Sequence, residues 1–458
     1  MKYFWKHDVP LRIIKVINVI MITLPFALSW IFFYSQHTAA LFAANAQRYV
    51  ILLYILVYFW LGRVYDAFLV SYNRISEMIF SQVLAAMLAD GVLYVVICFL
   101  CKSAQPVWPG LISIAAQTLM ATVWSFSAHG WYFKVFPPKT AYIVYDSREG
   151  FESLLHQYSL VRKFKVTKTF TAEEVVNDVT LLDGAEDVFL SGVHSHDRNV
   201  IIKYCAEKNI NALLIPRIGD VIMSGAHQMH IMHLPVLMVS RYRPTPEFRA
   251  MKRLCDIVFS LLAILILSPV LIITAIAVKS DGGPVLYKQK RLTLNRRVFE
   301  VYKFRSMRVD AEKDGVARLS TGDSDDRITK VGRFIRKVRI DELPQLFNVL
   351  KGEMSLVGPR PERPEIAEQY EKEMPEFSLR LQCKAGLTGY AQVYGKYNTT
   401  PYDKLVMDLM YIAEPSFVAD LRIILATFKI LFMPESTEGV AEGKVTAMEK
   451  KEELPDQE

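Results

Sequence analysis

The sequence contains few cysteines, and their spacing does not match a complete zinc site. Five cysteines occur in 458 residues. Cys98 and Cys101 form a Cys-x-x-Cys pair at the end of an apolar run, but no second pair accompanies them. We therefore interpret them as two thiols buried in a helix. The odd number and scattered positions of the cysteines are typical of a protein whose water-facing parts lie in a reducing compartment.

Several short signatures are also absent. No zinc-finger, helix-turn-helix or RNA-recognition motif accompanies the net charge of +7, so we expect contact with anionic lipids or phosphorylated substrates and no nucleic acid. No glycine fingerprint of a dinucleotide site follows residues 141–145, where the chain continues as Asp146-Ser147-Arg148-Glu149-Gly150. No small-residue cleavage site clearly follows the first apolar segment, which we interpret as a retained membrane helix.

Apolar residues are abundant: they make up 52% of the chain, against 22% charged residues. Four apolar segments fill the first third, each near the ~20 residues that cross a bilayer. They are residues 12–34, 48–66, 79–101 and 107–133. Asp90 is the only carboxylate well within one, which argues against a transport pathway. Basic residues at their flanks place the N-terminus, the middle loop and everything after residue 134 in the cytoplasm. We therefore expect a four-helix transmembrane domain at 1–138.

Residues 139–245 alternate short apolar runs with polar helical stretches, which is the βαβ rhythm of a small doubly wound, Rossmann-like α/β domain. We expect buried strands and one helix between two of them. The strands are 141–145, 187–190, 212–215 and 235–239, and the helix is 198–208. Because the glycine fingerprint is absent, a regulatory or structural module is the simpler interpretation.

Residues 254–278 form a further long apolar run, which Ser268-Pro269 interrupts. Lys252 and Arg253 precede this run and further basic residues follow it, so both ends favour the cytoplasmic side. Proline removes a backbone donor and kinks a helix, and a serine hydroxyl can bond to the carbonyl that is freed. We expect a re-entrant helix-break-helix. The alternative is a straight span with a proline kink, which would put the next segment outside the cell.

The chain after this helix is soluble in character up to about residue 432. We expect helices at 363–374, 400–412 and 417–432, the last of them amphipathic or apolar and suited to resting on the bilayer surface. Residues 434–458 carry many acids and almost no large apolar side chains, so we expect a disordered tail.

Five short motifs lie within about a hundred residues of one another in this part of the chain: 283–289, 302–307, 341–345, 355–361 and 384–389. They supply two adjacent carboxylates, Asp341 and Glu342, together with several cationic side chains and rigid Gly-Pro turns. Arginine pairs bidentately with phosphate oxygens, and a carboxylate holds Mg²⁺ against a diphosphate. This set of groups suits phosphoryl transfer, in which stabilisation of charge is most of the catalytic work.

Through these motifs, residues 252 to about 432 resemble the bacterial sugar transferases, polyprenyl-phosphate phosphoglycosyl transferases with one re-entrant membrane helix. The preceding spans and the α/β domain resemble the larger members, which prime capsule, exopolysaccharide or O-antigen synthesis. The resemblance implies a mainly helical catalytic domain at 246–433, on the cytoplasmic face of the bacterial cytoplasmic membrane. It implies transfer of a sugar 1-phosphate from a UDP-sugar to undecaprenyl phosphate, with release of UMP. Glucose and galactose are the first candidates for the sugar, ahead of N-acetylated sugars. A second copy of the chain and polysaccharide-assembly proteins are the expected partners.

The resemblance also implies roles for individual residues. Asp341 would attack the β-phosphorus of the UDP-sugar and form a phosphosugar–aspartyl intermediate, while Glu342, together with Asp341, would bind Mg²⁺. Five basic residues would bind the substrate or its phosphate groups: Lys303, Arg305, Arg336, Arg360 and Arg363. We expect the nearby guanidinium groups to lower the pKa of Asp341.

Other interpretations stay open. Glu342 could only favour a helix dipole, and Lys303 and Arg305 could extend to the membrane surface without touching substrate. A membrane-anchored nucleotide-sugar dehydratase or epimerase needs a tyrosine–lysine pair, and Tyr204 and Lys208 have that spacing. A non-catalytic scaffold for polysaccharide assembly is a third function.

Three positions depart from the family pattern. Thr293 and Arg296 stand where the family usually has glycines, and Ala385 stands where a proline is common. We expect the loop geometry around these positions to differ.

Overall fold

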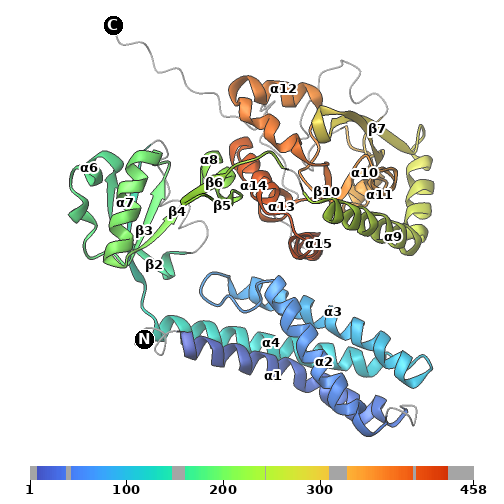
Figure 1. Cartoon of the computed structure of the whole chain (residues 1–458). Coiled ribbons are helices and arrows are strands. Elements are labelled where there is room, and N and C mark those ends of the chain that lie inside the picture. Colours follow the sequence, from blue (N-terminus) through green and yellow to red (C-terminus); the bar gives the residue numbers. More distant parts are fainter. Residues whose placement is uncertain are drawn as a thin grey trace. The chain divides into compact units, whose positions relative to one another are not determined.

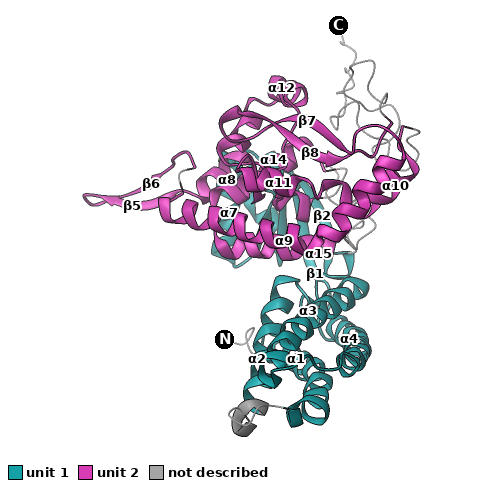
Figure 2. Ribbon diagram, turned by 90° about the vertical axis from the view of Figure 1, so that its right-hand side faces the viewer, with its two compact units in different colours: residues 1–215 teal, residues 216–458 magenta. Residues whose placement is uncertain are grey.

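The computed structural model describes residues 8–37, 43–146, 160–242, 244–308, 327–395 and 399–431. The chain divides into two compact units, residues 1–215 and 216–458 (Figure 2). Their helices and strands are labelled in Figure 1. The predicted disordered tail at 434–458 and the residues Ser147–Gly150 lie outside the described residues.

Four long helices occupy the four predicted membrane segments. They are α1 (Val9–Ser29), α2 (Ala43–Val64), α3 (Ile75–Cys101) and α4 (Trp108–Val135). A π-helical turn and a 3₁₀ turn extend α1 as far as His37. Within the described residues, four helices are long and apolar enough to cross a membrane: α1 with its extension, α3, α4 and α9 (Pro246–Ser280) of the second unit. The chain is therefore a membrane protein.

The four-helix bundle buries a few polar side chains among apolar ones and exposes many large apolar side chains. Asn18 donates to Gln82 Oε1 at 2.8 Å and accepts from the Tyr58 hydroxyl at 2.8 Å, and all three side chains are buried. Large apolar side chains such as Ile20 and Phe32 are exposed. This arrangement suits a helix bundle that faces lipid, because buried polar groups pair with one another while apolar groups face hydrocarbon.

The first unit also contains a parallel four-stranded sheet in the order β2-β1-β3-β4. The strands are β1 (Lys139–Tyr145), β2 (Phe164–Thr171), β3 (Asp187–Ser191) and β4 (Asn211–Leu214). Helices α6 (Ala172–Asn177) and α7 (Ser195–Lys208) connect them. Three of the expected strands and the expected helix are confirmed, but β4 is not buried as expected, since Leu214 is 39% exposed. The edge strand β2 was not expected, because its mostly polar sequence gives no buried apolar run.

The strand expected at 235–239 belongs to the second unit and is exposed. It is β6 (Leu234–Met238), which pairs antiparallel with β5 (His227–Ile231) in a hairpin that projects from the unit (Figure 2). Leu234 is 67% exposed and Leu237 50% exposed. The prediction that this strand is buried in the parallel sheet is therefore wrong. An apolar run alone does not distinguish a buried strand from an exposed one.

The rest of the second unit combines helices with two small sheets. Strands β7 (Leu286–Leu292) and β8 (Val298–Phe304) form an antiparallel pair, and β9 (Ser355–Val357) and β10 (Gly386–Thr388) form a parallel pair. The helices are α8 (Ile218–Ser224), α10 (Lys330–Lys337), α11 (Gln345–Lys351), α12 (Pro364–Glu373), α13 (Tyr390–Tyr394), α14 (Pro401–Ala413) and α15 (Phe417–Leu431). The three helices expected after residue 363 are confirmed as α12, α14 and α15.

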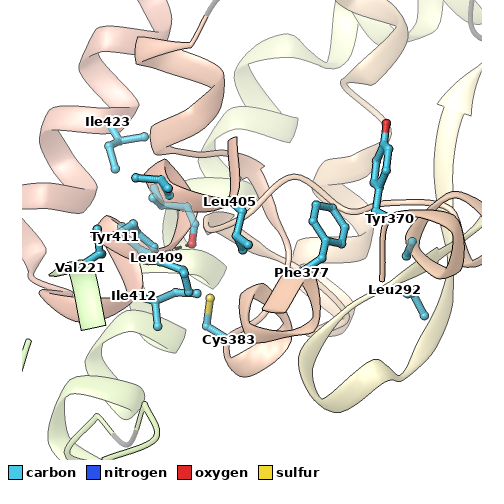
Figure 3. Close-up of a cluster of buried hydrophobic side chains, with 13 residues drawn as sticks. Val221, Leu292, Tyr370, Phe377, Cys383, Leu405, Leu409, Tyr411, Ile412 and Ile423 are labelled. Atoms are coloured by element: carbon cyan, nitrogen blue, oxygen red, sulfur yellow. Dashed lines mark hydrogen bonds between the residues drawn. The ribbon is translucent and has the colours of Figure 1, made fainter. Parts of the chain in front are cut away.

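One apolar cluster joins α8, α12, α14 and α15. Figure 3 shows Tyr370 of α12, Leu405 of α14 and Ile423 of α15 in the same cluster as Leu292 at the end of β7. Leu405 is completely buried. This core packs the end of β7 against α12, α14 and α15.

Helix α9 continues through Pro269 without an interruption, although a break was expected there. Proline 269 has no N–H for the carbonyl of Leu265, and the Ser268 hydroxyl donates to that oxygen at 2.8 Å. The expected role of Ser268 is therefore confirmed. Figure 1 shows the ribbon of α9 changing direction between its olive and yellow parts.

Candidate active site

The acidic pair lies in a tight turn between two helices. Helix α10 ends at Lys337, and Arg339 then adopts a left-handed backbone conformation (φ 55°), which in a non-glycine residue costs on the order of 1–3 kcal/mol. A 3₁₀ turn over Ile340–Glu342 follows, and α11 begins at Gln345. The bend at Arg339 separates the two helices and places both carboxylates on the turn between them.

Two cations from distant segments meet on one oxygen of Glu342. Lys303 of β8 donates to Glu342 Oε1 at 2.7 Å, and Arg360, beyond β9, donates to the same oxygen at 2.9 Å. The Glu342 side chain is only 15% exposed. Burial opposes its ionisation, but Arg360 and Lys303 outweigh burial and hold the pKa of Glu342 well below its usual range. Glu342 is therefore a carboxylate at neutral pH.

Asp341 has the opposite shift. Burial and the neighbouring charge of Glu342 raise the pKa of Asp341 to about 6, although Lys303, Arg336 and Arg360 act to lower it. The prediction of a lowered pKa is therefore wrong, because desolvation and the adjacent acid exceed the effect of the cations. Within the described part of the chain, Asp341 has no hydrogen-bond or ion-pair partner. At pH 7 a group with a pKa of about 6 is mostly ionised, so Asp341 is a carboxylate near three cations.

Close backbone contacts hold the loop that carries Arg360. The Gly386 N–H donates to the carbonyl of Pro359 and the Gly358 N–H donates to that of Thr388, both at 2.9 Å. A Cβ atom on Gly386 would lie 2.1 Å from the Gly358 nitrogen, so only glycine allows this approach. The motifs at 355–361 and 384–389 therefore act together to fix the position of Arg360.

The buried side chain of Arg380 holds the main chain of Arg360. Arg380 donates to the main-chain oxygen of Arg360 at 2.8 Å and forms a 2.7 Å ion pair with Asp408 of α14. Burial raises the pKa of Asp408 to about 6, although Arg380 opposes the shift. Arg380 was not predicted as a site residue. Asp408 gave a signal, because it occupies the apolar face of α14 beside Leu405 and Leu409.

Three of the five predicted phosphate-binding residues interact with the acidic pair, and the other two do so less directly or not at all. Lys303 and Arg360 contact Glu342, and Arg336, in the last turn of α10, acts on the charge of Asp341. Arg305 differs, because it is 6% exposed and its guanidinium donates to the carbonyls of Val278, Gly282, Pro284 and Met307. We assign it to holding the loop after α9 and not to phosphate. Arg363 precedes the first turn of α12.

The acidic pair has oxygen atoms that could contribute to a magnesium site. No group of three or more metal-ligating side chains occurs among the described residues. Mg²⁺ is usually held by one or two carboxylates together with substrate phosphates. Both hydrogen bonds to Glu342 end on Oε1 and do not occupy Oε2, and Asp341 is unengaged in the described part of the chain. Asp341 and Glu342 are therefore the two residues that could hold such an ion.

The pair of Tyr204 and Lys208 does not have the properties of a dehydratase site. The Tyr204 hydroxyl donates to Asp183 Oδ1 at 2.6 Å, and this hydrogen bond raises the pKa of Tyr204 to about 12. A catalytic tyrosine that exchanges a proton near neutral pH needs a lower pKa. The structure therefore favours an ordinary surface role for both residues.

Comparisons with known proteins point to one family. The family model described as bacterial sugar transferase matches residues 247–434. A galactosyl transferase CpsE of Streptococcus agalactiae is 46% identical over 192 residues, which is 40% of this chain and 42% of that protein. A UDP-N-acetylgalactosamine-undecaprenyl-phosphate N-acetylgalactosaminephosphotransferase of Aeromonas hydrophila is 37% identical over 231 residues, 50% of this chain and 53% of that protein.

A shorter relative is covered more fully. A putative undecaprenyl-phosphate N-acetylgalactosaminyl 1-phosphate transferase of Bacillus subtilis is 46% identical over 138 residues, 30% of this chain and 76% of that protein. The chain thus spans about half the length of the two longer relatives and three quarters of the shorter one. The family match includes the segment that carries Asp341, Glu342 and Arg360.

Proposed function

Because this chain belongs to the bacterial sugar transferase family, we propose that it transfers a sugar 1-phosphate from a UDP-sugar to undecaprenyl phosphate. One observation carries the proposal: the free carboxylate of Asp341 lies next to Glu342, which Lys303 and Arg360 hold at 2.7 and 2.9 Å. The names of the Aeromonas and Bacillus proteins support the acceptor and the type of transfer. The product would start exopolysaccharide, capsule or O-antigen synthesis.

In the first step, an oxygen of Asp341 attacks the β-phosphorus of the UDP-sugar. A bond forms between this oxygen and the phosphorus, and the bond from the phosphorus to the bridging oxygen breaks. UMP leaves with that oxygen and its electron pair, and the sugar phosphate is left on Asp341. The reaction needs an ionised Asp341, which its pKa of about 6 supplies at neutral pH.

In the second step, a phosphate oxygen of undecaprenyl phosphate attacks the same phosphorus. The bond from phosphorus to Asp341 breaks, and the carboxylate is restored. Lys303 and Arg360 stabilise negative charge on the phosphates, while Arg380 keeps Arg360 in place.

Mg²⁺ held by Glu342 and Asp341 would neutralise charge on the diphosphate of the donor. Lys303 and Arg360 contribute to this site by keeping Glu342 ionised. Because these two cations already offset the charge of Glu342, we expect weak binding of the metal without the nucleotide.

We also propose that α9 is re-entrant, so that it enters and leaves the same face of the membrane. At its first turns, Arg253 donates to the carbonyls of Val349 and Leu350, both at 2.6 Å. At its far end, Arg305 donates to the carbonyl of Val278 at 3.0 Å. Both ends of the apolar run thus bind the same unit, whereas a crossing helix would separate its ends by ~30 Å of hydrocarbon. This topology puts the active site on the cytoplasmic face.

The transferred sugar is not determined by these residues, since the relatives are named for different sugars. Glucose and galactose are our first candidates, and a panel of UDP-sugars would identify the donor. A second copy of the chain and proteins of polysaccharide assembly are further expected partners.

The test uses the full chain in membranes with a UDP-sugar, undecaprenyl phosphate and Mg²⁺. We expect UMP release that Asp341→Asn abolishes, and that Glu365→Gln, on the exposed face of α12, leaves unchanged. UMP release that Asp341→Asn does not alter would refute the nucleophile, and no release with any UDP-sugar would favour a scaffold.

A further inference from the structure

A second cationic site lies at the turn between β7 and β8, apart from the acidic pair. A cavity of about 300 Å³ opens there, and we name it the Arg297–Lys384 cavity. Its lining includes Thr293, Asn295, Arg297, Gly352, Glu353 and Lys384. None of the residues that contact Glu342 lines it.

The cavity has more positive than negative charge available to a ligand. Arg297 and Lys384 carry no side-chain hydrogen bond or ion pair in the part of the chain that the structure describes. The one acid in the lining, Glu353, accepts from Asn348 Nδ2 at 2.7 Å. Arg253 lies next to the lining residue Gly352, but its guanidinium already donates to the carbonyls of Val349 and Leu350.

These charges are unfavourable without a counter-ion. Lys384 is partly buried, and burial together with Arg253 and Arg297 lowers its pKa by more than the nearby Asp256 raises it. An ammonium group held among guanidinium groups away from water raises the free energy of the folded state. An anion in the cavity would offset this cost, and lysine and arginine together suit phosphate oxygens.

Thr293, which lines the cavity, and Ala385, which follows Lys384, are two of the positions that depart from the family pattern. The Ala385 N–H donates to Thr293 Oγ1 at 3.1 Å, and the Thr293 hydroxyl donates to the carbonyl of Glu353 at 3.1 Å. A proline at 385 would have no N–H, and a glycine at 293 would have no acceptor. The two departures therefore match each other and fix Lys384 beside the cavity.

We propose that the Arg297–Lys384 cavity binds a phosphate group through these two cations. The group comes either from an anionic lipid or from a soluble phosphate. The lipid source has support in α9, because Arg253 at the rim is followed directly by the exposed apolar side chains of Leu254 and Ile257. Cationic side chains at the start of a membrane-embedded helix attract anionic headgroups.

The experiment measures how fast an acetylating reagent modifies Lys384, by mass spectrometry of the full chain in nanodiscs. Three preparations are compared: phosphatidylcholine alone, phosphatidylcholine with phosphatidylglycerol, and phosphatidylcholine with soluble pyrophosphate. Lys290, exposed on β7, is the internal reference. We expect at least a threefold slower modification of Lys384 relative to Lys290 in one of the last two preparations.

Protection by phosphatidylglycerol alone identifies a lipid, and protection by pyrophosphate identifies a soluble phosphate. Arg297→Gln should abolish the protection. Asp341→Asn should retain it, because the cavity does not use the acidic pair, and this separates the result from the proposed transfer reaction. Equal modification of Lys384 in all three preparations, or full protection in Arg297→Gln, overturns the proposal.

Discussion

Arg380 donates a 2.8 Å hydrogen bond to the main-chain oxygen of Arg360, so a buried arginine positions the arginine that contacts Glu342. The same guanidinium forms an ion pair with Asp408 at 2.7 Å. The position of an active-site cation thus depends on a buried pair between two other residues.

The substitution Arg380→Gln should therefore affect both stability and turnover. It leaves Asp408 buried without its partner, which we expect to destabilise the fold by about 3–5 kcal/mol. The double variant Arg380→Met with Asp408→Leu removes both charges, and we expect it to regain most of this stability in thermal unfolding. Its kcat/KM should still be about ten- to a hundredfold low, because Arg360 has lost its support. A double variant with full activity would show that Arg380 acts on stability alone.

The pKa of Asp341 predicts an acidic limb in the pH profile of kcat/KM. Attack needs the carboxylate, so activity should fall as the pH drops through about 6. Arg336 lowers this pKa, so Arg336→Gln should raise it and move the limb to higher pH. Lys337→Gln, on the exposed side of the same helix, is the control and should leave the limb in place. A limb that does not move in Arg336→Gln, or moves to lower pH, would contradict the electrostatic account.

The pair of Thr293 and Ala385 predicts a coupled pair of substitutions. Thr293→Gly leaves the buried Ala385 N–H without an acceptor, which should cost about 1–3 kcal/mol. Ala385→Pro removes that N–H, so the double variant should be more stable than Thr293→Gly alone. Thermal unfolding of the four proteins of this cycle gives the coupling. Additive effects would mean that the two departures are independent.

The re-entrant topology predicts that both ends of α9 face the cytoplasm. Single cysteines at Met251 and Asp281, in a chain whose native cysteines are replaced by serine, should react with an impermeant thiol reagent only after cells are permeabilised. A cysteine at Ser103, between α3 and α4, should react in intact cells. Labelling of 251 and 281 from opposite sides would establish a crossing helix instead.

Much of the fold follows from simple patterns in the sequence. The four helices of the first third give long apolar runs, and α12, α14 and α15 give helical periodicity. The strand β2 and the exposed hairpin β5–β6 give misleading patterns, because β2 is a mostly polar edge strand and β6 is apolar but uncovered. Burial depends on neighbours that are distant in sequence, and local composition does not reveal them.

The candidate site, too, could be predicted from the sequence only in part. Asp341, Glu342, Lys303 and Arg360 belong to motifs that indicate phosphate chemistry, and the structure brings all four together. Arg305 belongs to one of the motifs as well, but its guanidinium is enclosed by carbonyls. The pKa of Asp341 depends on how far burial outweighs nearby cations, which only the three-dimensional arrangement determines.

Helix α9 is also tied to the strand that leads to Arg360, since Asp256 accepts from the Leu356 N–H at 2.9 Å and from the Ser355 hydroxyl at 3.1 Å. Leu356 and Ser355 belong to β9, four residues or so before Arg360. We therefore expect a change in how deeply α9 sits in the lipid to reach an active-site cation through Asp256. On this expectation, the turnover rate should vary with the thickness of the surrounding bilayer and with the choice of detergent.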